Sequence, residues 1–80
     1  MDSTAQPLLH LAPGQAAIVA DVQAPEETRT RMLELGFLPG TPVQLVRFAP
    51  LGDPVEIRLR GYNLTLRRHE VEYIQVLPHA

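Results

Sequence analysis

Eight prolines and five glycines are spread along the whole of this 80-residue chain. Proline breaks the interior of a helix, and glycine weakens both helices and strands. The sequence therefore predicts short segments joined by tight turns. A chain of this length hides only about 60% of its surface on folding, which allows one small core. We expect a single domain over residues 1–80, with its core at about 8–77 and tails at 1–6 and 78–80.

Composition and charge are typical of a soluble globular protein. Hydrophobic residues make up 45% and charged residues 20%, and the net charge is −2. This charge gives no electrostatic reason to expect binding to nucleic acid or to an anionic membrane. The aliphatic run at 16–20 is far shorter than the roughly 20 residues that span a bilayer, and the N-terminus does not resemble a signal peptide. We expect a cytoplasmic protein without direct membrane insertion, and the lack of cysteine agrees with this.

Hydrophobic periodicity predicts five strands and one helix. The helix is expected at about 25–35, with Glu26 and Glu27 in its first turn and Gly36 as its left-handed cap. A short helical turn is expected at about 68–72. The strands are expected at 15–22, 43–48, 55–60, 63–67 and 73–77. In the first strand, one side is expected to carry Ala16, Ile18, Ala20 and Val22.

The third and fourth strands form the best-defined predicted hairpin. Gly61 and Tyr62 match the two-residue loop of a type II′ turn. The register set by this loop brings Glu56 and Arg67 opposite each other on the outer face, which is a favourable charge pair. The predicted register is Leu59 opposite Leu64, Ile57 opposite Leu66 and Glu56 opposite Arg67.

Five short strands cannot bury their inner faces as a flat sheet in so few residues. Closure into a small barrel buries these faces and removes exposed edges. The sequence therefore predicts a mainly β fold, a small five-stranded barrel with one inserted α-helix. The residues expected to shape its turns are Gly36, Pro39, Gly40, Gly52 and Gly61.

Three segments carry a family resemblance. They are Arg-Met-Leu-Glu-Leu-Gly-Phe-Leu-Pro-Gly-Thr at 31–41, Ala-Pro-Leu-Gly-Asp-Pro at 49–54 and Arg-Gly-Tyr-Asn-Leu-Thr-Leu-Arg-Arg at 60–68. In this order and spacing, they resemble the FeoA family of small cytoplasmic proteins in bacterial ferrous iron transport. The match runs from about Leu8 to Val76. The family usually has alanine where this chain has Thr65 and Val71.

The resemblance implies an SH3-like barrel and a protein without enzymatic activity. It also implies a partner, the membrane GTPase and iron permease FeoB, with the protein acting at its cytosolic face. The resemblance implies association with transition metal ions only as a general property of the family. No cofactor is expected. Weak self-association is left open.

Apolar residues on the turn after the helix and on a later loop are the first candidates for partner binding. Apolar side chains on a cap and a turn are hard to bury, and exposed apolar clusters mark interaction sites. On this basis we expect Phe37 and Leu38 to contact a partner, together with Leu51. Met32 and Leu35 fit better as core residues.

An arginine face is the second candidate surface. The predicted hairpin puts Arg58, Arg60 and Arg67 on one outer face, where they could meet an acidic protein or a phosphate. A solvated strand face explains the same pattern and is the favoured interpretation. Stacking platforms for nucleic-acid bases are also scarce, because the chain has two phenylalanines, two tyrosines and no tryptophan.

A dedicated metal site and catalysis are both disfavoured. The histidines are His10, His69 and His79, and their spacing does not bring three or four ligands together. We therefore expect adventitious metal binding at most. The sequence has no phosphate loop or nucleophile elbow, and its one serine lies in the tail. The alternative to a FeoB partner is a general SH3-like adaptor that binds an extended peptide in a shallow apolar groove.

Overall fold

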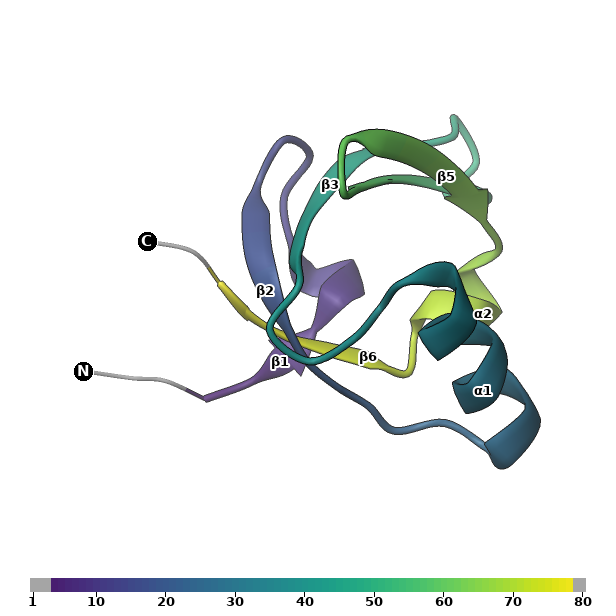
Figure 1. Cartoon of the computed structure of the whole chain (residues 1–80). Helices are drawn as coiled ribbons and strands as arrows, with labels where there is room; N and C mark the ends of the chain where they lie inside the picture. Colours follow the sequence, from purple (N-terminus) through teal and green to yellow (C-terminus); the bar gives the residue numbers. More distant parts are fainter. Residues whose placement is uncertain (1–3, 79–80) are drawn as a thin grey trace.

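The computed structural model describes residues 4–78 as one curved antiparallel sheet with helices at one side (Figure 1). Its elements are β1 (Gln6–Pro7), η1 (a 3₁₀ turn, Leu8–His10), β2 (Ala16–Val22), α1 (Glu26–Leu35), β3 (Pro42–Phe48), β4 (Val55–Leu59), β5 (Tyr62–Leu66), α2 (Arg68–Val71) and β6 (Ile74–Pro78). Hydrogen-bonded neighbours follow the order β1-β6-β2-β3-β4-β5. The mainly β fold, the inserted helix and the short helical turn are therefore confirmed.

Strand β1 was not expected, and it makes the sheet of the described residues six-stranded. It pairs with β6, with Gln6 opposite Val76. Two residues expected in the tails are therefore strand residues, Gln6 in β1 and Pro78 in β6. A chain end tied into a sheet is ordered by its ladder, which composition alone does not reveal.

Two bulges curve the sheet around the core. The register shifts between Val19 and Asp21 in β2, and between Leu45 and Arg47 in β3. A bulge adds one residue to one strand, bends that strand and increases its twist. The bending lets β2 to β5 wrap around a single apolar interior.

The expected side of β2 is wrong for Ala16, Ile18 and Ala20 and correct for Val22. The buried residues are Ala17, Val19 and Val22, whereas Ile18 and Ala20 are only partly buried. Both sides of this strand are apolar, so alternation could not identify the inner one. The bulge then puts Val19 and Val22 on the same side although three positions separate them.

The hairpin register is also wrong, although the inner faces were assigned correctly. The loop consists of Arg60 and Gly61, whose φ angles are 54° and 86°. Two positive φ values in a two-residue loop define a type I′ turn, not the expected type II′ turn. The observed partners are Leu59 with Tyr62, Ile57 with Leu64 and Glu56 with Thr65. The shift equals two residues, so each strand keeps its inner face, but the expected pair of Glu56 with Arg67 does not form.

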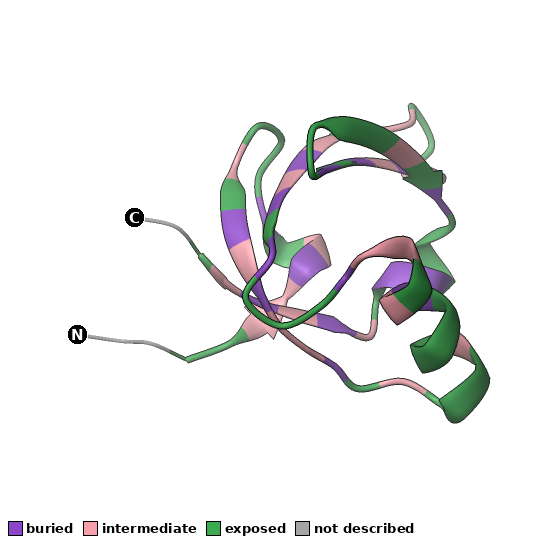
Figure 2. Ribbon diagram, in the orientation of Figure 1, coloured by how far each residue is buried: buried purple, intermediate pink, exposed green. Residues whose placement is uncertain are grey.

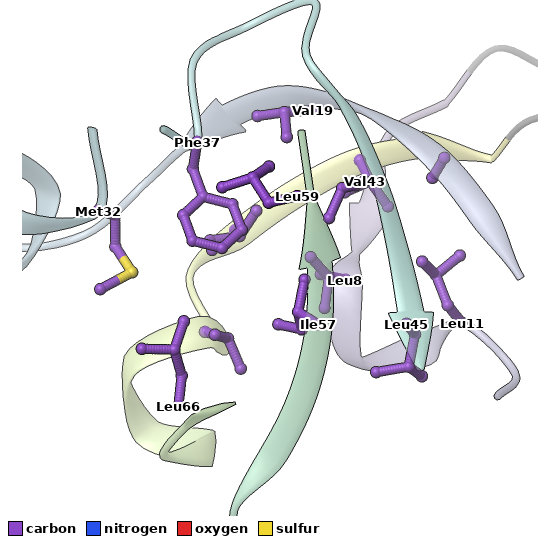
Figure 3. Close-up of a cluster of buried hydrophobic side chains, with 14 of the residues drawn as sticks. Leu8, Leu11, Val19, Met32, Phe37, Val43, Leu45, Ile57, Leu59 and Leu66 are labelled. Carbon is purple, nitrogen blue, oxygen red and sulfur yellow. The ribbon is translucent and has the colours of Figure 1, made fainter. Parts of the chain in front are cut away.

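The core lies inside the curved sheet and under α1, as the buried residues in Figure 2 show. Its largest fully buried side chain is Phe37, and Met32 comes from the inner side of α1. Figure 3 shows these two side chains together with Leu59 and the aliphatic residues of the strands. The helix thus covers one open end of the sheet.

Glu70 links the two helices. Its carboxylate accepts a hydrogen bond from the backbone N–H of Arg67 (3.1 Å) and forms an ion pair with Arg31 of α1. The first contact caps α2, and the second holds α2 against α1. This is why a nearly buried carboxylate is tolerated.

Candidate docking surfaces

Phe37 is not a docking residue, because its side chain is completely buried. Gly36 ends α1 with φ +118°, and the N–H of Phe37 donates to the carbonyl of Met32 (3.1 Å). This left-handed cap turns the chain back and directs the ring into the core. The expected fold-back toward Met32 is correct, but the expected exposure of Phe37 is wrong.

Leu38 lies on the next turn and is 42% exposed. The N–H of Thr41 donates to the carbonyl of Leu38 (3.0 Å), and Gly40 has φ +90°, as a type II turn requires. Gly40 also donates its N–H to the carbonyl of Val19 (2.7 Å). Leu38 is therefore presented on a turn that is fixed to β2.

Leu51 is 96% exposed at the tip of the loop between β3 and β4. Arg68 holds the base of this loop, because its backbone N–H donates to Asp53 (3.0 Å) and its Nη1 donates to the carbonyl of Gly52 (3.2 Å). The same guanidinium lies 5.5 Å from the centre of the Phe48 ring, in a cation–π contact. The tip is thus exposed on a well-anchored base.

Leu38 and Leu51 do not form one continuous patch. Their loops, at 36–41 and 49–54, lie well apart in Figure 1. A third apolar residue, Tyr62, is 45% exposed and is not among the expected docking residues. The sequence predicts Tyr62 in the loop of the hairpin, whereas it begins β5, and its hydroxyl donates to the carbonyl of Leu35 in α1 (3.0 Å). The only feature of the sequence that indicates Tyr62 as a surface residue is its aromatic side chain at a predicted turn.

The three arginines expected on one face are separated. Arg58 and Arg60 border an open pocket of about 350 Å³, whose other walls include Ala16, Pro42, Val43 and Gln44. Arg67 follows β5 and lies 3.9 Å from the carboxylate of Asp53, on a different part of the surface. The shifted hairpin register explains the difference, because it moves Arg67 beyond the paired residues of β4.

Glu56 is the centre of a polar network on the outer face of the hairpin. It accepts hydrogen bonds from Arg47 Nε (2.9 Å) and from Asn63 Nδ2 (2.7 Å). The hydrogen bond from Arg47, followed by that from Asn63, lowers the pKa of the Glu56 carboxyl below its ordinary value. Arg58 completes the network, because its Nε donates to Asn63 Oδ1 (3.2 Å).

The histidines lie far apart along the chain. His10 ends η1, His69 lies in α2, and His79 is outside the described residues. His69 borders an open pocket of about 330 Å³ together with Glu27 and Glu70, but the Glu70 carboxylate is already engaged by Arg31. Over residues 4–78, no three histidine, aspartate or glutamate side chains form a group that could hold a metal ion. In the same part of the chain, neither helix is long and apolar enough to cross a membrane.

The glycines expected at turns share one backbone feature, although the turn at Gly61 is type I′ and not the expected type II′. Each of the expected glycines has a positive φ, namely Gly36, Gly40, Gly52 and Gly61. Pro39 precedes Gly40 in the turn that carries Leu38. Gly36 is confined further, because a Cβ added there would lie 3.1 Å from Leu59 Cδ2.

Known proteins similar to this chain agree on one family. The model of the FeoA domain matches residues 6–78. An Fe(2+) transport protein A/Fe(2+) transporter FeoB fusion protein of Porphyromonas gingivalis is 39% identical over 69 residues, which are 86% of this chain but 8% of that protein.

Solved structures are similar over most of the chain. FeoA of Chlorobium tepidum has a TM-score of 0.86 at 41% identity and is matched over 94% of this chain and 71% of its own. FeoA of Stenotrophomonas maltophilia, a zinc complex described as an SH3 domain protein, has a TM-score of 0.76 at 28% identity, over 91% and 88% of the two chains. The curved sheet is thus an SH3-like fold, and the chain belongs to the FeoA family of ferrous iron transport.

Proposed function

We propose that this chain is a non-enzymatic accessory protein of ferrous iron uptake that docks on a FeoB-type membrane GTPase and permease at its cytosolic face. The observation that carries the proposal is the fusion relative, in which an FeoA part and a FeoB part share one polypeptide. A covalent link keeps two partners at a high effective concentration, which is useful when they act together. This chain spans 8% of that relative, and docking on FeoB is the association that the fusion suggests for it.

Leu38 and Leu51 are the proposed anchors. Both are exposed, and both lie on turns that hydrogen bonds already hold in place. A preorganised anchor loses little conformational entropy on binding, and truncating a central apolar anchor typically costs about 1–3 kcal/mol of binding free energy. Because the two leucines lie well apart, each contacts a different part of the partner. The buried side chain of Phe37 fixes the turn that carries Leu38.

The experiment is a pull-down with the FeoB cytosolic domain and, separately, with the FeoB membrane part. Leu38→Asp and Leu51→Asp are expected to lose binding and FeoB-dependent iron uptake, with an unchanged melting midpoint. Arg58→Ala and Arg60→Ala are matched surface controls, and they should alter only the salt dependence. Folded aspartate variants with normal uptake would place the docking surface elsewhere. Unfolded variants would mean that these leucines stabilise the fold.

One observation supports the second candidate, a general adaptor for extended peptides. The lining of the pocket beside Arg58 and Arg60 includes the apolar residues Pro42 and Val43. Ala16 is exposed and lines this pocket, so Ala16→Trp should fill the pocket without disturbing the core. Normal iron uptake by this variant favours docking through the leucines, whereas loss of uptake with retained folding favours the adaptor.

A further inference from the structure

Strand β5 is an edge of the sheet. Its sole strand neighbour among residues 4–78 is β4. The other end of the sheet is the two-residue β1, so the five-residue β5 is the longer free edge. A free edge exposes a row of backbone donors and acceptors that can pair with another strand.

The free groups of β5 belong to Asn63 and Thr65. The pair that closes the two-residue turn, Leu59 and Tyr62, exchanges its backbone hydrogen bonds within the hairpin. Alternation then points the N–H and C=O groups of Asn63 and Thr65 away from β4. Elsewhere in residues 4–78, no backbone or side-chain group hydrogen-bonds to them.

This edge lacks the features that normally protect edges. Its five residues, Tyr62–Leu66, pair with β4 in one unbroken register, without a bulge. They include no proline and no charged residue. Proteins commonly use bulges, prolines and charged side chains to prevent pairing at an edge strand. A regular, uncharged edge is suited to accept a strand from a partner.

The outer face beside this edge is basic. Its charged side chains are two arginines, Arg47 and Arg58, and a single glutamate. That glutamate, Glu56, is engaged by Arg47 and Asn63. Arg58 extends across the sheet to Asn63 (Nε to Oδ1, 3.2 Å), which directs its guanidinium toward the free edge. No carboxylate of residues 4–78 lies within ion-pair distance of Arg58.

The opposite face of the same edge is apolar. Tyr62 is exposed, and Leu64 is only partly buried against the core. Side chains of an added strand would alternate between these two faces. On one face they would cover Tyr62 and Leu64, and on the other they would approach Arg58.

We propose that β5 accepts an extended segment as an additional strand, and that this segment alternates acidic and apolar residues. Charge complementarity selects this occupant, because acidic side chains on the outer face would meet Arg58. A second copy of the chain fits less well, because pairing β5 with β5 would bring two basic hairpins together. This interaction is separate from docking through Leu38 and Leu51, and its test does not involve FeoB.

The first test uses the wild-type chain and two synthetic peptides. The probe is the blocked heptapeptide Glu-Val-Glu-Val-Glu-Val-Glu, and the control has lysine in place of each glutamate. Titration of ¹⁵N-labelled protein should shift the amide signals of Asn63 and Thr65 most. The lysine peptide should bind at least about tenfold more weakly, as expected from losing a charge-assisted contact. Equal binding of both peptides, binding elsewhere, or no shift at millimolar peptide overturns the proposal. Self-association through β5 without peptide overturns it in favour of a second copy.

The second test removes one outward N–H. Thr65→Pro deletes a donor that the β4–β5 ladder does not use, and Thr65→Val keeps this donor with a similar shape. The proline variant should bind the acidic peptide about tenfold more weakly, whereas the valine variant should bind like wild type. Melting curves confirm that both variants fold. If Thr65→Pro does not fold, Arg58→Gln tests the same site and should reduce the preference for the acidic peptide. A folded Thr65→Pro protein with wild-type affinity contradicts strand addition.

Discussion

The hydroxyl of Tyr62 donates a hydrogen bond of 3.0 Å to the backbone carbonyl of Leu35. This contact joins the beginning of β5 to the last residue of α1, two segments 27 positions apart in the chain. It satisfies one of the carbonyls that a helix end leaves without an intrahelical partner. The tight approach of Gly36 to Leu59 lies at the same junction. The helix end and the hairpin are therefore fixed to one another.

Substitution of Tyr62 measures how much its hydrogen bond to Leu35 contributes to the free energy of unfolding. Tyr62→Phe should lower the free energy of unfolding by about 0.5–1.5 kcal/mol, since it removes one hydrogen bond and little apolar area. Tyr73→Phe is the control, because the Tyr73 hydroxyl has no hydrogen-bond partner in the part of the chain that the structure describes. Urea unfolding of the three proteins provides the comparison. Equal losses in both variants would contradict a specific contact with Leu35.

The turn of the hairpin gives a second prediction. Gly61→Val should destabilise the protein by about 1–3 kcal/mol, because Gly61 has φ +86° and a β-branched residue is strained there. Gly61→Asn should recover part of this loss, since asparagine tolerates the left-handed region. Melting midpoints of the two variants are the measurement, and an unchanged midpoint for Gly61→Val would contradict the turn.

Arg60 distinguishes the observed turn from the one expected from sequence. Arg60 has φ +54°, so Arg60→Asn should stabilise the protein by about 0.5–1 kcal/mol by creating the preferred Asn-Gly pair of a type I′ turn. In the expected register, position 60 would be a strand residue, and asparagine there would destabilise. The sign of the change in unfolding free energy therefore tests the register itself.

The hairpin also shows what the sequence could and could not predict. Alternation identified the inner residues Ile57 and Leu59 correctly, because burial depends on the face and not on the partner. A shift of two residues keeps every inner residue inside, so alternation cannot fix the register. The charge pair of Glu56 with Arg67 then favoured the wrong register, whereas Glu56 bonds to Arg47 of β3 instead.

The candidate site was predictable only in part, for a related reason. Local signals located the turns and predicted exposure of Leu38 and Leu51, which the structure confirms. They failed for Phe37, because its burial depends on the space between α1 and the sheet, which no local pattern describes. They also missed Tyr62, whose exposure and contact with Leu35 depend on the true hairpin register.

Iron binding gives a fourth prediction. The isolated chain should not hold Fe(II) stoichiometrically, because an iron site needs several convergent nitrogen or oxygen ligands. His69 borders one pocket with Glu27 and Glu70, but Glu70 already bonds to Arg31 and to the N–H of Arg67. Anaerobic equilibrium dialysis against Fe(II) is the measurement, with His69→Ala as the matched variant. One tightly held ion per chain, lost in that variant, would show a site at α2.

Glu56 gives the last prediction, which concerns pH. Its pKa in the folded protein lies below its ordinary value, chiefly because Arg47 donates a hydrogen bond to the carboxylate and next because Asn63 does. The folded state therefore binds fewer protons at this residue than the unfolded state. Its contribution to stability is present above the unfolded pKa and is lost as the pH falls through the folded pKa. Glu56→Gln should reduce the loss of stability on the acid side.

The causes of this shift can be ranked by experiment. Arg47→Gln should raise the Glu56 pKa toward its ordinary value more than Arg58→Gln does, because Arg47 both bonds to the carboxylate and attracts it, whereas Arg58 acts only through its charge. NMR titration of the Glu56 carboxyl carbon in each variant measures this, and unfolding at several acidic pH values measures the linked stability. A wild-type Glu56 pKa at or above the ordinary value, or a larger rise in Arg58→Gln, would contradict the network. Added salt should diminish the Arg58 effect more than the Arg47 effect, since screening weakens exposed charge pairs more than a direct hydrogen bond.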